Sequence, residues 1–162
     1  MNKIRVLIVD DSALVRSVLN EILSYEESID VVGEAVDPFD AREKIKQLKP
    51  DVLTLDIEMP KMDGITFLRN LMKLNPMPVI MISTLTHAGA NVTLQALEIG
   101  AIDFIAKPTA SAVDKELRLF QLDLVSKIKV AAAAENKLKF RRSAVAKAMP
   151  QHSISNLVHK NQ

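Results

Sequence analysis

The segment IRVLIVDD, residues 4–11, decides the fold. Its first six residues, Ile4–Val9, are all apolar except Arg5, which is typical of a strand that is buried on both faces. Two aspartates, Asp10 and Asp11, end the run. A strand of this kind belongs to a parallel sheet that helices cover on both sides.

Four further β-rich runs follow this strand and alternate with segments of helical period. The predicted strands are Ile29–Val36, Val52–Leu55, Pro78–Ile82 and Asp103–Ala106. The first two predicted helices begin near Val15 and at Pro38. The other three cover Ile65–Leu74, Ala90–Ile99 and the stretch from Leu117 through the alanines to Ala134. Five βα units predict an α/β fold with a doubly wound parallel sheet over residues 1–130.

Three residues mark helix ends. Asp37 suits an N-cap, and Pro38 suits the first helical position because its missing N–H would have no intrahelical partner there. Gly100 is placed to end the helix that Ile99 closes.

The composition restricts the class of protein. The chain has 162 residues, 48% of them hydrophobic, and no cysteine, which excludes disulfides and a thiolate metal site. The apolar run Val6–Val9 is too short for a secretory signal, and no run approaches the roughly 18 residues of a membrane span. We expect a soluble, cytoplasmic protein without membrane insertion.

The charge is distributed unevenly along the chain. Residues 1–134 carry 15 basic and 19 acidic side chains, whereas residues 135–162 carry six basic side chains and one acid, Glu135. The acidic part should be folded, and residues 131–162 should be a basic linker or tail that is poorly ordered or partly helical. The basic residues are sparse and lack aromatic partners, so we expect no nucleic-acid binding.

Polar side chains stand where four of the predicted strands end. They are Asp10-Asp11, Asp56, Ser83-Thr84 and Lys107-Pro108. Ligands of an open parallel sheet bind outside the carboxyl ends of its strands. Each residue alone is more commonly a turn, cap or surface residue. Together they predict one site that contains three carboxylates, a hydroxyl and an ammonium group.

The chemistry of these groups points to phosphoryl transfer. Crowded carboxylates repel one another, and a hard cation such as Mg²⁺ relieves that repulsion. The absence of Cys, and of His among these residues, disfavours zinc. A carboxylate is also a nucleophile toward phosphorus, and Lys107 would neutralise the transferring group.

The set Asp10-Asp11, Asp56, Ser83 and Lys107-Pro108 resembles the signature of response-regulator receiver domains of two-component systems. The segments Met59-Pro60, Met62-Asp63-Gly64 and Gly100-Ala101-Ile102-Asp103-Phe104 also match, and the resemblance covers residues 3–130. It implies a flavodoxin-like, five-stranded sheet of order 2-1-3-4-5.

The resemblance also implies roles for individual residues. Asp56 would take phosphate from a histidine kinase. Asp11, Asp56 and the backbone carbonyl of Glu58 would hold Mg²⁺ directly, and Asp10 mainly through water.

For the response to phosphorylation, the resemblance implies that Lys107 bridges to the phosphoryl oxygens. Ser83 would move to hydrogen-bond them, and Phe104 would turn inward behind it. The Lys107–Pro108 bond would be cis. The surface of the fourth helix, fifth strand and fifth helix would then change shape and control an effector.

A narrower resemblance concerns the receiver of chemotaxis protein-glutamate methylesterases. It rests on residues 52–72 and 76–109, including Ser83-Thr84-Leu85-Thr86 and Gly89-Ala90. That family carries an esterase domain with a Ser-His-Asp triad after a linker. Here no nucleophile elbow is found, and only His87, His152 and His159 are present, with His87 expected in a loop. The chain itself should catalyse only its own phosphorylation and dephosphorylation.

Three functions remain open. The chain is expected to be the phosphorylated regulatory part of a methylesterase whose effector domain is not in this sequence. Alternatively, it is a stand-alone receiver that binds a partner directly. A haloacid-dehalogenase-type phosphatase is disfavoured because that class needs Asp-x-Asp after its first strand, whereas Asp10 and Asp11 are adjacent.

Overall fold

A computed structural model describes residues 2–59, 61–84, 87–109 and 111–148. Its centre is a five-stranded sheet in the order β2-β1-β3-β4-β5, in which every neighbouring pair is parallel. The strands are β1 (Ile4–Val9), β2 (Ile29–Ala35), β3 (Val52–Asp56), β4 (Val79–Ser83) and β5 (Asp103–Ala106). The predicted fold class and strand order are confirmed.

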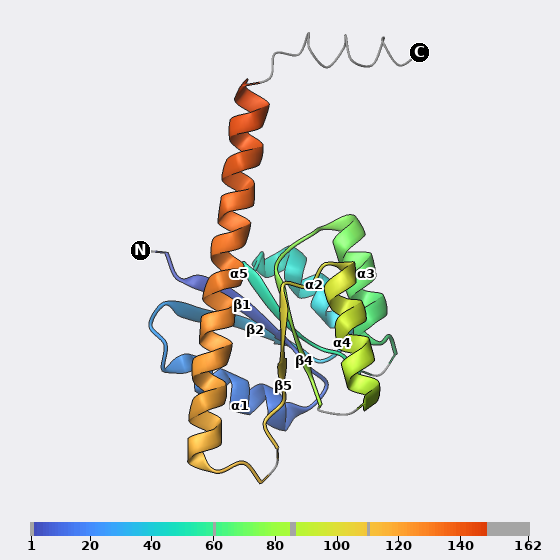
Figure 1. Cartoon of the computed structure of the whole chain (residues 1–162), viewed down its shortest axis with the longest axis vertical. Helices are drawn as coiled ribbons and strands as arrows, with labels where there is room; N and C mark the ends of the chain where they lie inside the picture. The colour runs from blue at the N-terminus through green and yellow to red at the C-terminus, as the bar shows by residue number, and fades with distance from the viewer. Residues whose placement is uncertain (1, 60, 85–86, 110, 149–162) are drawn as a thin grey trace. The chain divides into compact units, whose positions relative to one another are not determined.

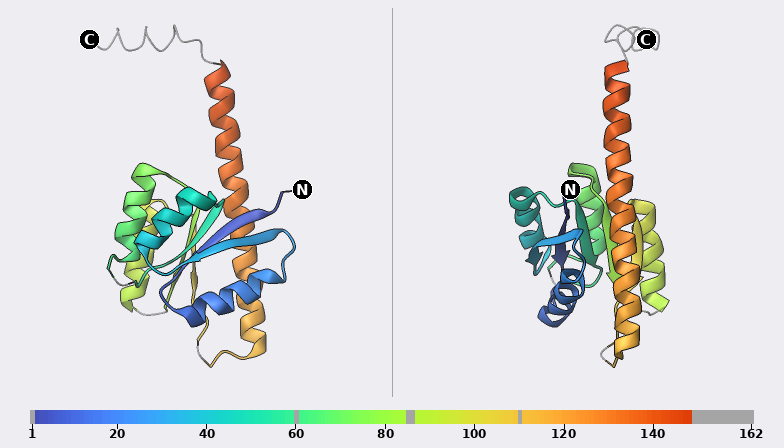
Figure 2. Two further views of the ribbon diagram at one scale, coloured as in Figure 1. Left: turned by 180° about the vertical axis from the view of Figure 1, so that it is seen from behind. Right: turned by 90° about the vertical axis from the view of Figure 1, so that its left-hand side faces the viewer.

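Five helices connect and follow the strands. They are α1 (Ala13–Ser24), α2 (Pro38–Leu48), α3 (Gly64–Leu74), α4 (His87–Ile99) and α5 (Asp114–Ala148). Helix α1 and the first part of α5 cover one face of the sheet, and α2, α3 and α4 cover the other (Figures 1 and 2). This arrangement buries both faces, as the apolar strands require.

Alternate residues of each strand supply two separate cores. In β1, Val6 and Ile8 pack toward α1 and α5, whereas Leu7 and Val9 pack toward α2 and α3. All four side chains are almost fully buried. Burying such side chains contributes about 1.5–3 kcal/mol each. The strand whose sequence decides the fold is therefore also the strand that anchors both layers.

The predicted helix ends are confirmed by their hydrogen bonds. The Asp37 carboxylate accepts the Asp40 N–H at 2.8 Å, with Pro38 as the first helical residue of α2. Gly100 has a φ of +138°, which only glycine adopts readily, and its N–H closes α4 on the Ala96 carbonyl. The sharp turn leads directly into β5.

Two helix boundaries differ from the prediction. Helix α4 starts at His87 rather than Ala90, so His87 is a helical residue and its assignment to a loop was wrong. Helix α5 starts at Asp114 and continues to Ala148, well beyond Ala134. Residues 131–148 contain neither Gly nor Pro and are rich in Ala, Lys and Arg, all good helix formers.

The long helix α5 crosses the boundary between two compact units. The first unit ends at Ala132, and the second begins at Ala133. No helix within the described residues is both long and apolar enough to cross a membrane.

Candidate functional site

The site starts at the turn from β1 into α1. Asp10 is buried directly after the strand, and its N–H donates to the Ala35 carbonyl of β2 at 3.0 Å. One oxygen of its carboxylate, Oδ1, accepts the Ser12 N–H at 2.9 Å. Ser12 in turn caps α1 by accepting the Val15 N–H. Asp11 is exposed beside this turn, so the turn presents one buried and one open carboxylate.

Asp56 is the last residue of β3, and its carboxylate is buried with 2% of the residue exposed. The Glu58 N–H donates to its Oδ1 at 3.2 Å. The backbone carbonyl of Asp56 packs against Gly64 so closely that a Cβ built on Gly64 would lie 2.4 Å from it. Glycine at position 64 therefore permits α3 to start directly against the end of β3.

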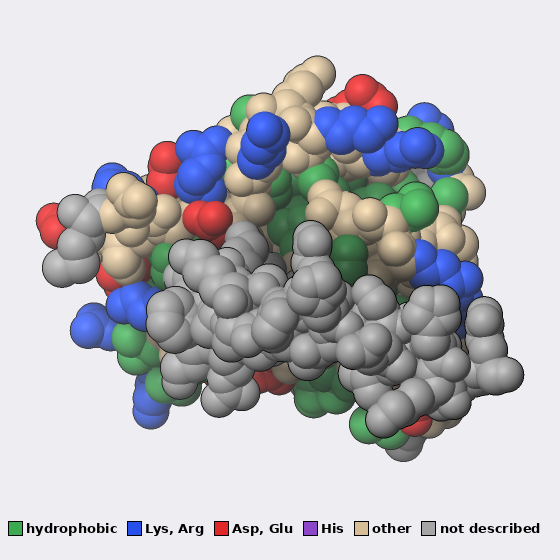
Figure 3. All heavy atoms as spheres, turned by 90° about the horizontal axis from the view of Figure 1, so that it is seen from above, with side chains coloured by type: hydrophobic (Ala, Val, Ile, Leu, Met, Phe, Trp, Pro, Cys, Tyr) green, Lys and Arg blue, Asp and Glu red, His purple; other side chains and the backbone are tan. Residues whose placement is uncertain are grey.

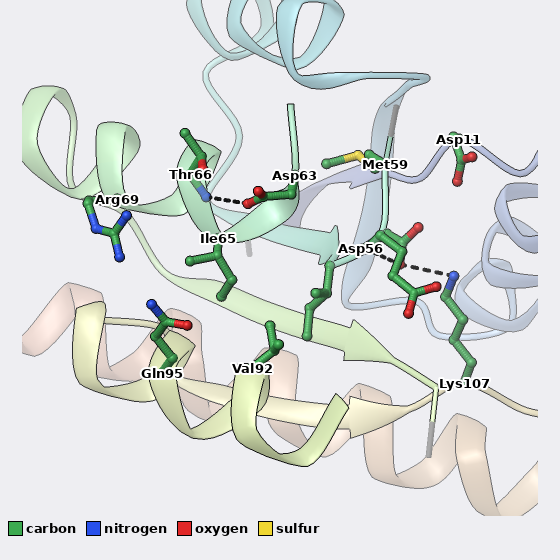
Figure 4. A pocket seen from close by; sticks show the side chains of 12 residues that line it. Asp11, Asp56, Met59, Asp63, Ile65, Thr66, Arg69, Val92, Gln95 and Lys107 are labelled. Carbon is green, nitrogen blue, oxygen red and sulfur yellow. Dashed lines mark hydrogen bonds and ion pairs between the residues drawn. The ribbon is translucent and has the colours of Figure 1, made fainter. Parts of the chain in front are cut away.

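Lys107, which follows the edge strand β5, links the ends of β1 and β3. Its ammonium nitrogen lies 3.0 Å from Oδ1 of Asp56 and 3.4 Å from Oδ2 of Asp10. Its backbone N–H donates to the Ser83 carbonyl at 2.8 Å, which fixes the chain after β5 beside β4. The side chain itself is mostly buried. One cation is thus shared by two buried carboxylates, and Figure 4 shows its link to Asp56.

The predicted cis bond between Lys107 and Pro108 is wrong for this structure, because no cis peptide bond occurs within the described residues. Lys107 reaches both carboxylates with a trans peptide. Its long side chain spans the gap once Lys107 N–H is fixed on Ser83.

Burial and the neighbouring charges set the ionisation of the three groups. It raises the pKa of Asp56 to about 6, and the nearby Asp10 charge adds to this, whereas Lys107 and the Glu58 N–H act in the opposite direction. Burial also raises the pKa of Asp10, although the hydrogen bond from the Ser12 N–H and the charge of Lys107 act to lower it. Burial alone would lower the pKa of Lys107, but the hydrogen bond to Asp56 and the charges of Asp56 and Asp10 together raise it.

The donor set fits a hard divalent cation. One oxygen from each of Asp10, Asp11 and Asp56 lies within 4.8 Å of the others. Among the described residues, Oδ2 of Asp56 and Oδ2 of Asp10 are buried without a hydrogen-bond partner. Buried acceptors of this kind are costly, so they call for a further positive group. Carboxylate oxygens with room for water are what Mg²⁺ accepts.

The remaining predicted site residues lie around this centre. Glu58 lies beside Asp56 and lines the same cleft. Ser83 ends β4 next to Lys107, and its hydroxyl lies 3.4 Å from the Thr93 hydroxyl of α4. Phe104 lies on β5 and is 41% exposed, so its ring faces outward and is not part of the cleft lining.

A cleft of about 810 Å³ extends from the carboxylates between α3 and α4 (Figure 4). Its lining includes residues that the sequence analysis did not single out: Thr66, Arg69, Val92 and Gln95. Asp63 also lines it and caps α3 through the Thr66 N–H at 2.8 Å. Helical spacing places Thr66 and Arg69 on one face of α3, and Val92 and Gln95 on one face of α4, but no sequence pattern shows that the two faces meet.

Comparison with known proteins identifies the fold and the family. Residues 6–117 match the model of the response regulator receiver domain. The chain is 68% identical over 108 residues to a protein-glutamate methylesterase/protein-glutamine glutaminase of Hydrogenovibrio crunogenus, covering 67% of this chain and 29% of that protein. It is 57% identical over 141 residues to one from Xanthomonas oryzae, covering 87% of this chain and 39% of that protein.

Solved structures agree. The response regulator domain of Thermotoga maritima CheB matches with a TM-score of 0.72 and 47% identity, covering 82% of this chain and 98% of that one. A chain of the CheX–CheY–BeF₃–Mg²⁺ complex of Borrelia burgdorferi matches with a TM-score of 0.65 and 34% identity, covering 78% of this chain and 87% of that one.

The chain spans between 29% and 39% of the length of these two methylesterases and matches almost the whole of the CheB receiver structure. The match includes the strand tips that carry Asp10, Asp56 and Lys107. This protein belongs to the response regulator receiver domain family, and its relatives include the receivers of protein-glutamate methylesterases.

Proposed function

We propose that this chain is a phosphorylation-activated switch in which Asp56 accepts a phosphoryl group from the phosphohistidine of a histidine kinase. The observation that carries the proposal is the state of the Asp56 carboxylate. It is buried, its Oδ2 has no hydrogen-bond partner among the described residues, and it faces two other carboxylates and the Lys107 ammonium. A structural aspartate in a turn would be solvated or fully hydrogen-bonded.

In the proposed reaction, a carboxylate oxygen of Asp56 attacks the phosphorus atom. The new bond is P–O, the P–N bond to the donor imidazole breaks, and its electron pair stays on that nitrogen. With a pKa of about 6, Asp56 is mostly ionised at neutral pH and needs no general base. Lys107 is placed to neutralise the phosphoryl oxygens.

Asp10, Asp11 and Asp56, with the Glu58 backbone carbonyl, would hold Mg²⁺ beside the acceptor. When bound, the cation supplies positive charge against the phosphoryl oxygens. The protein's own contribution is to fix these ligands and to expel water from around the Asp56 carboxylate. The related CheX–CheY complex of Borrelia burgdorferi contains Mg²⁺, which supports the choice of metal.

The proposed switch uses Ser83 and Phe104. Phosphorylation adds about −1.5 to −2 charge and three strong acceptor oxygens at Asp56. The Ser83 hydroxyl, now beside Thr93, would turn toward the phosphoryl group and draw the chain after β4 with it. Phe104, now 41% exposed, would turn inward. The surface of α4, β5 and α5 would change shape as a result.

The output of the switch is proposed to be control of a protein-glutamate methylesterase domain in chemotaxis. The similarity to methylesterase receivers supports this choice. Residues 131–162 would then be the basic linker to that domain, and the whole protein would act in the cytoplasm. Reading the coding sequence beyond residue 162 is the direct check: an open frame with a Ser-His-Asp esterase supports the proposal, and an immediate stop favours a stand-alone receiver.

The central experiment is mass spectrometry of the chain after incubation with acetyl phosphate and Mg²⁺. We expect one added phosphoryl group on the native chain and none on Asp56→Asn, because the amide is not a nucleophile. We expect none on the native chain when Mg²⁺ is removed with a chelator. Equal labelling of both chains, or labelling of another residue, would contradict the assignment. Steady hydrolysis of a phosphate monoester would instead favour a phosphatase.

A further inference from the structure

Arg16 has no role in the proposed phosphoryl transfer, yet its side chain contacts the turn that carries Asp10 and Asp11. It lies in the first turn of α1, and its side chain is only 15% exposed. Its Nη1 donates to the backbone carbonyl of Asp10 at 2.7 Å, and its Nε lies 3.2 Å from the Glu34 carboxylate of β2. A surface arginine that served only solubility would extend into water. This one is folded back over the turn that carries Asp10 and Asp11.

The contact with Arg16 completes the immobilisation of Asp10. The Asp10 N–H is held by Ala35, its carbonyl by Arg16, and its Oδ1 by the Ser12 N–H. Three of its four backbone and side-chain polar groups are therefore fixed by the protein. The fourth, Oδ2, is the buried oxygen that faces Lys107 and lies in the carboxylate cluster.

Glu34 holds the guanidinium in the orientation that this contact requires. The end of β2 is itself fastened, because Lys44 donates to the Glu34 backbone carbonyl and pairs with Asp40 at 3.2 Å. Glu34 also compensates the Arg16 charge, so that the guanidinium opposes a bound cation less strongly.

We infer that Arg16 is a positioning residue, which acts through the Asp10 carbonyl to hold the β1–α1 turn in the conformation that binds Mg²⁺. The inference rests on the proposed function, since it concerns affinity for that cation. Partners that hold a metal ligand from outside the coordination shell commonly change metal affinity 10- to 100-fold when they are removed. The turn carries Asp11 as well as Asp10, so loss of Arg16 removes one support of the segment that carries both ligands.

The competing explanation is that Arg16 only stabilises the fold, and the chain offers a matched control for it. Arg5, at the opposite end of β1, donates its Nη2 to the Leu48 carbonyl at 2.6 Å. It is the same chemical contact, made far along the strand from the carboxylates. Arg5 is exposed, so Arg5→Met should cost less stability than Arg16→Met, and it should leave the cation site intact.

The test is a Mg²⁺ titration of the whole chain followed by amide NMR, reading the signals of Asp11, Ile57 and Glu58. The chain has no tryptophan, so fluorescence is less suitable. We expect Arg16→Met to weaken Mg²⁺ binding about 10-fold and Arg5→Met to leave it unchanged. Arg16→Lys should be intermediate, because a lysine keeps the charge but does not make both contacts in the same geometry. Glu34→Gln should weaken binding less than Arg16→Met.

A second readout separates binding from chemistry. With acetyl phosphate, Arg16→Met should need about 10-fold more Mg²⁺ for half-maximal phosphorylation of Asp56 and reach the native rate when Mg²⁺ saturates. Spectra and thermal unfolding without Mg²⁺ check that each variant is folded. Should Arg16→Met be unfolded, Arg16→Lys and Glu34→Gln carry the test.

Two results overturn the inference. One is native Mg²⁺ affinity in Arg16→Met, or in both Arg16→Lys and Glu34→Gln. The other is an equal loss of affinity in Arg5→Met, which would show a general effect of stability. Failure of the proposed function looks different, because the native chain would then bind no Mg²⁺ at the carboxylates or gain no phosphoryl group.

Discussion

The two ends of the sheet use the same kind of contact for different purposes. At the end where the strands begin, Arg5 holds the Leu48 carbonyl, and the exposed Asp51 carboxylate accepts the Arg5 N–H at 2.8 Å. At the end where the strands finish, Arg16 holds the Asp10 carbonyl, but the carboxylates of Asp10 and Asp56 are buried. At the first end the carboxylate is exposed and hydrogen-bonded, whereas at the second, within the part of the chain that the structure describes, Oδ2 of Asp10 and Oδ2 of Asp56 are buried without a hydrogen bond.

The surface around the first end is consistent with this difference. Figure 3 looks onto the end where the strands begin and shows Lys and Arg side chains along much of its rim. Charges there are solvated and contribute little individually. At the opposite end the Asp10 and Asp56 carboxylates and most of the Lys107 side chain are buried beside an open cleft. Burial, and not the presence of charge, therefore distinguishes the end with the proposed site from the other end.

The largest expected effect comes from removing the Lys107 ammonium group, which Asp10 and Asp56 share. Lys107→Met should slow phosphorylation of Asp56 by acetyl phosphate about 100-fold, or about 2.7 kcal/mol, because the variant loses a preorganised charge facing the phosphoryl oxygens. Time-resolved mass spectrometry measures the rate. Lys127→Met, which removes an ion pair with Asp123 on α5, is the control and should label at the native rate. An unchanged rate in Lys107→Met would remove that lysine from the mechanism.

The next effect comes from adding a single methyl group. Gly64→Ala places a Cβ 2.4 Å from the Asp56 carbonyl, which backbone movement alone can relieve. We expect a loss of about 1–3 kcal/mol in the free energy of unfolding, together with slower labelling of Asp56. In Gly33→Ala the new atom meets only side-chain ends, those of Leu48 at 2.7 Å and Leu7 at 3.5 Å, so the loss should be smaller and labelling unaffected. Urea denaturation and labelling rates compare the two variants.

The pH dependence of stability should reveal the buried carboxylates. Because the pKa of Asp56 is raised from 3.8 to about 6, the folded chain holds more protons than the unfolded chain between these values. The free energy of unfolding without divalent cation should therefore fall as pH rises from about 4 to 6, and the loss stays complete above that range. The full shift corresponds to roughly 3 kcal/mol, and solvent in the open cleft reduces our expectation to about 1–2 kcal/mol.

Asp56→Asn provides the control for that measurement. It should flatten the decline and be more stable than the native chain at pH 7.5 without Mg²⁺, although it accepts no phosphoryl group. Denaturant titrations at pH 4.5 and 7.5 give the comparison. A native chain whose stability rises across this window would contradict the burial argument.

The smallest effect is expected from a carboxylate at the other end of the sheet. Asp51→Ala removes the acceptor of the exposed Arg5 N–H and should cost about 0.5–1 kcal/mol. Labelling of Asp56 and its Mg²⁺ dependence should stay native. Removal of the Asp51 carboxylate would thus destabilise the protein, whereas removal of the Asp56 carboxylate would stabilise it at pH 7.5 without Mg²⁺. Stabilisation by Asp51→Ala would erase the contrast between the two ends.

The sequence by itself determined the elements of the fold and the residue types at the strand tips. Continuous apolar runs specify buried strands, Asp37-Pro38 starts a helix, and Gly100 ends one, because each of these signals acts within a few residues. The parallel arrangement then brings Asp10, Asp56 and Lys107 to one edge, since equivalent strand ends meet there. The end of α5 was missed because good helix formers continue past its periodic stretch, and the start of α4 because His87 and Gly89 are poor helix formers.

Only the tertiary structure decided how the gathered groups interact. The sharing of Lys107 between two carboxylates, the raised pKa of Asp56, the trans Lys107–Pro108 bond and the hold of Arg16 on Asp10 all depend on distances between separate elements. Burial and electrostatic energies change steeply over a few ångströms, and sequence spacing does not fix distances of that size across a sheet.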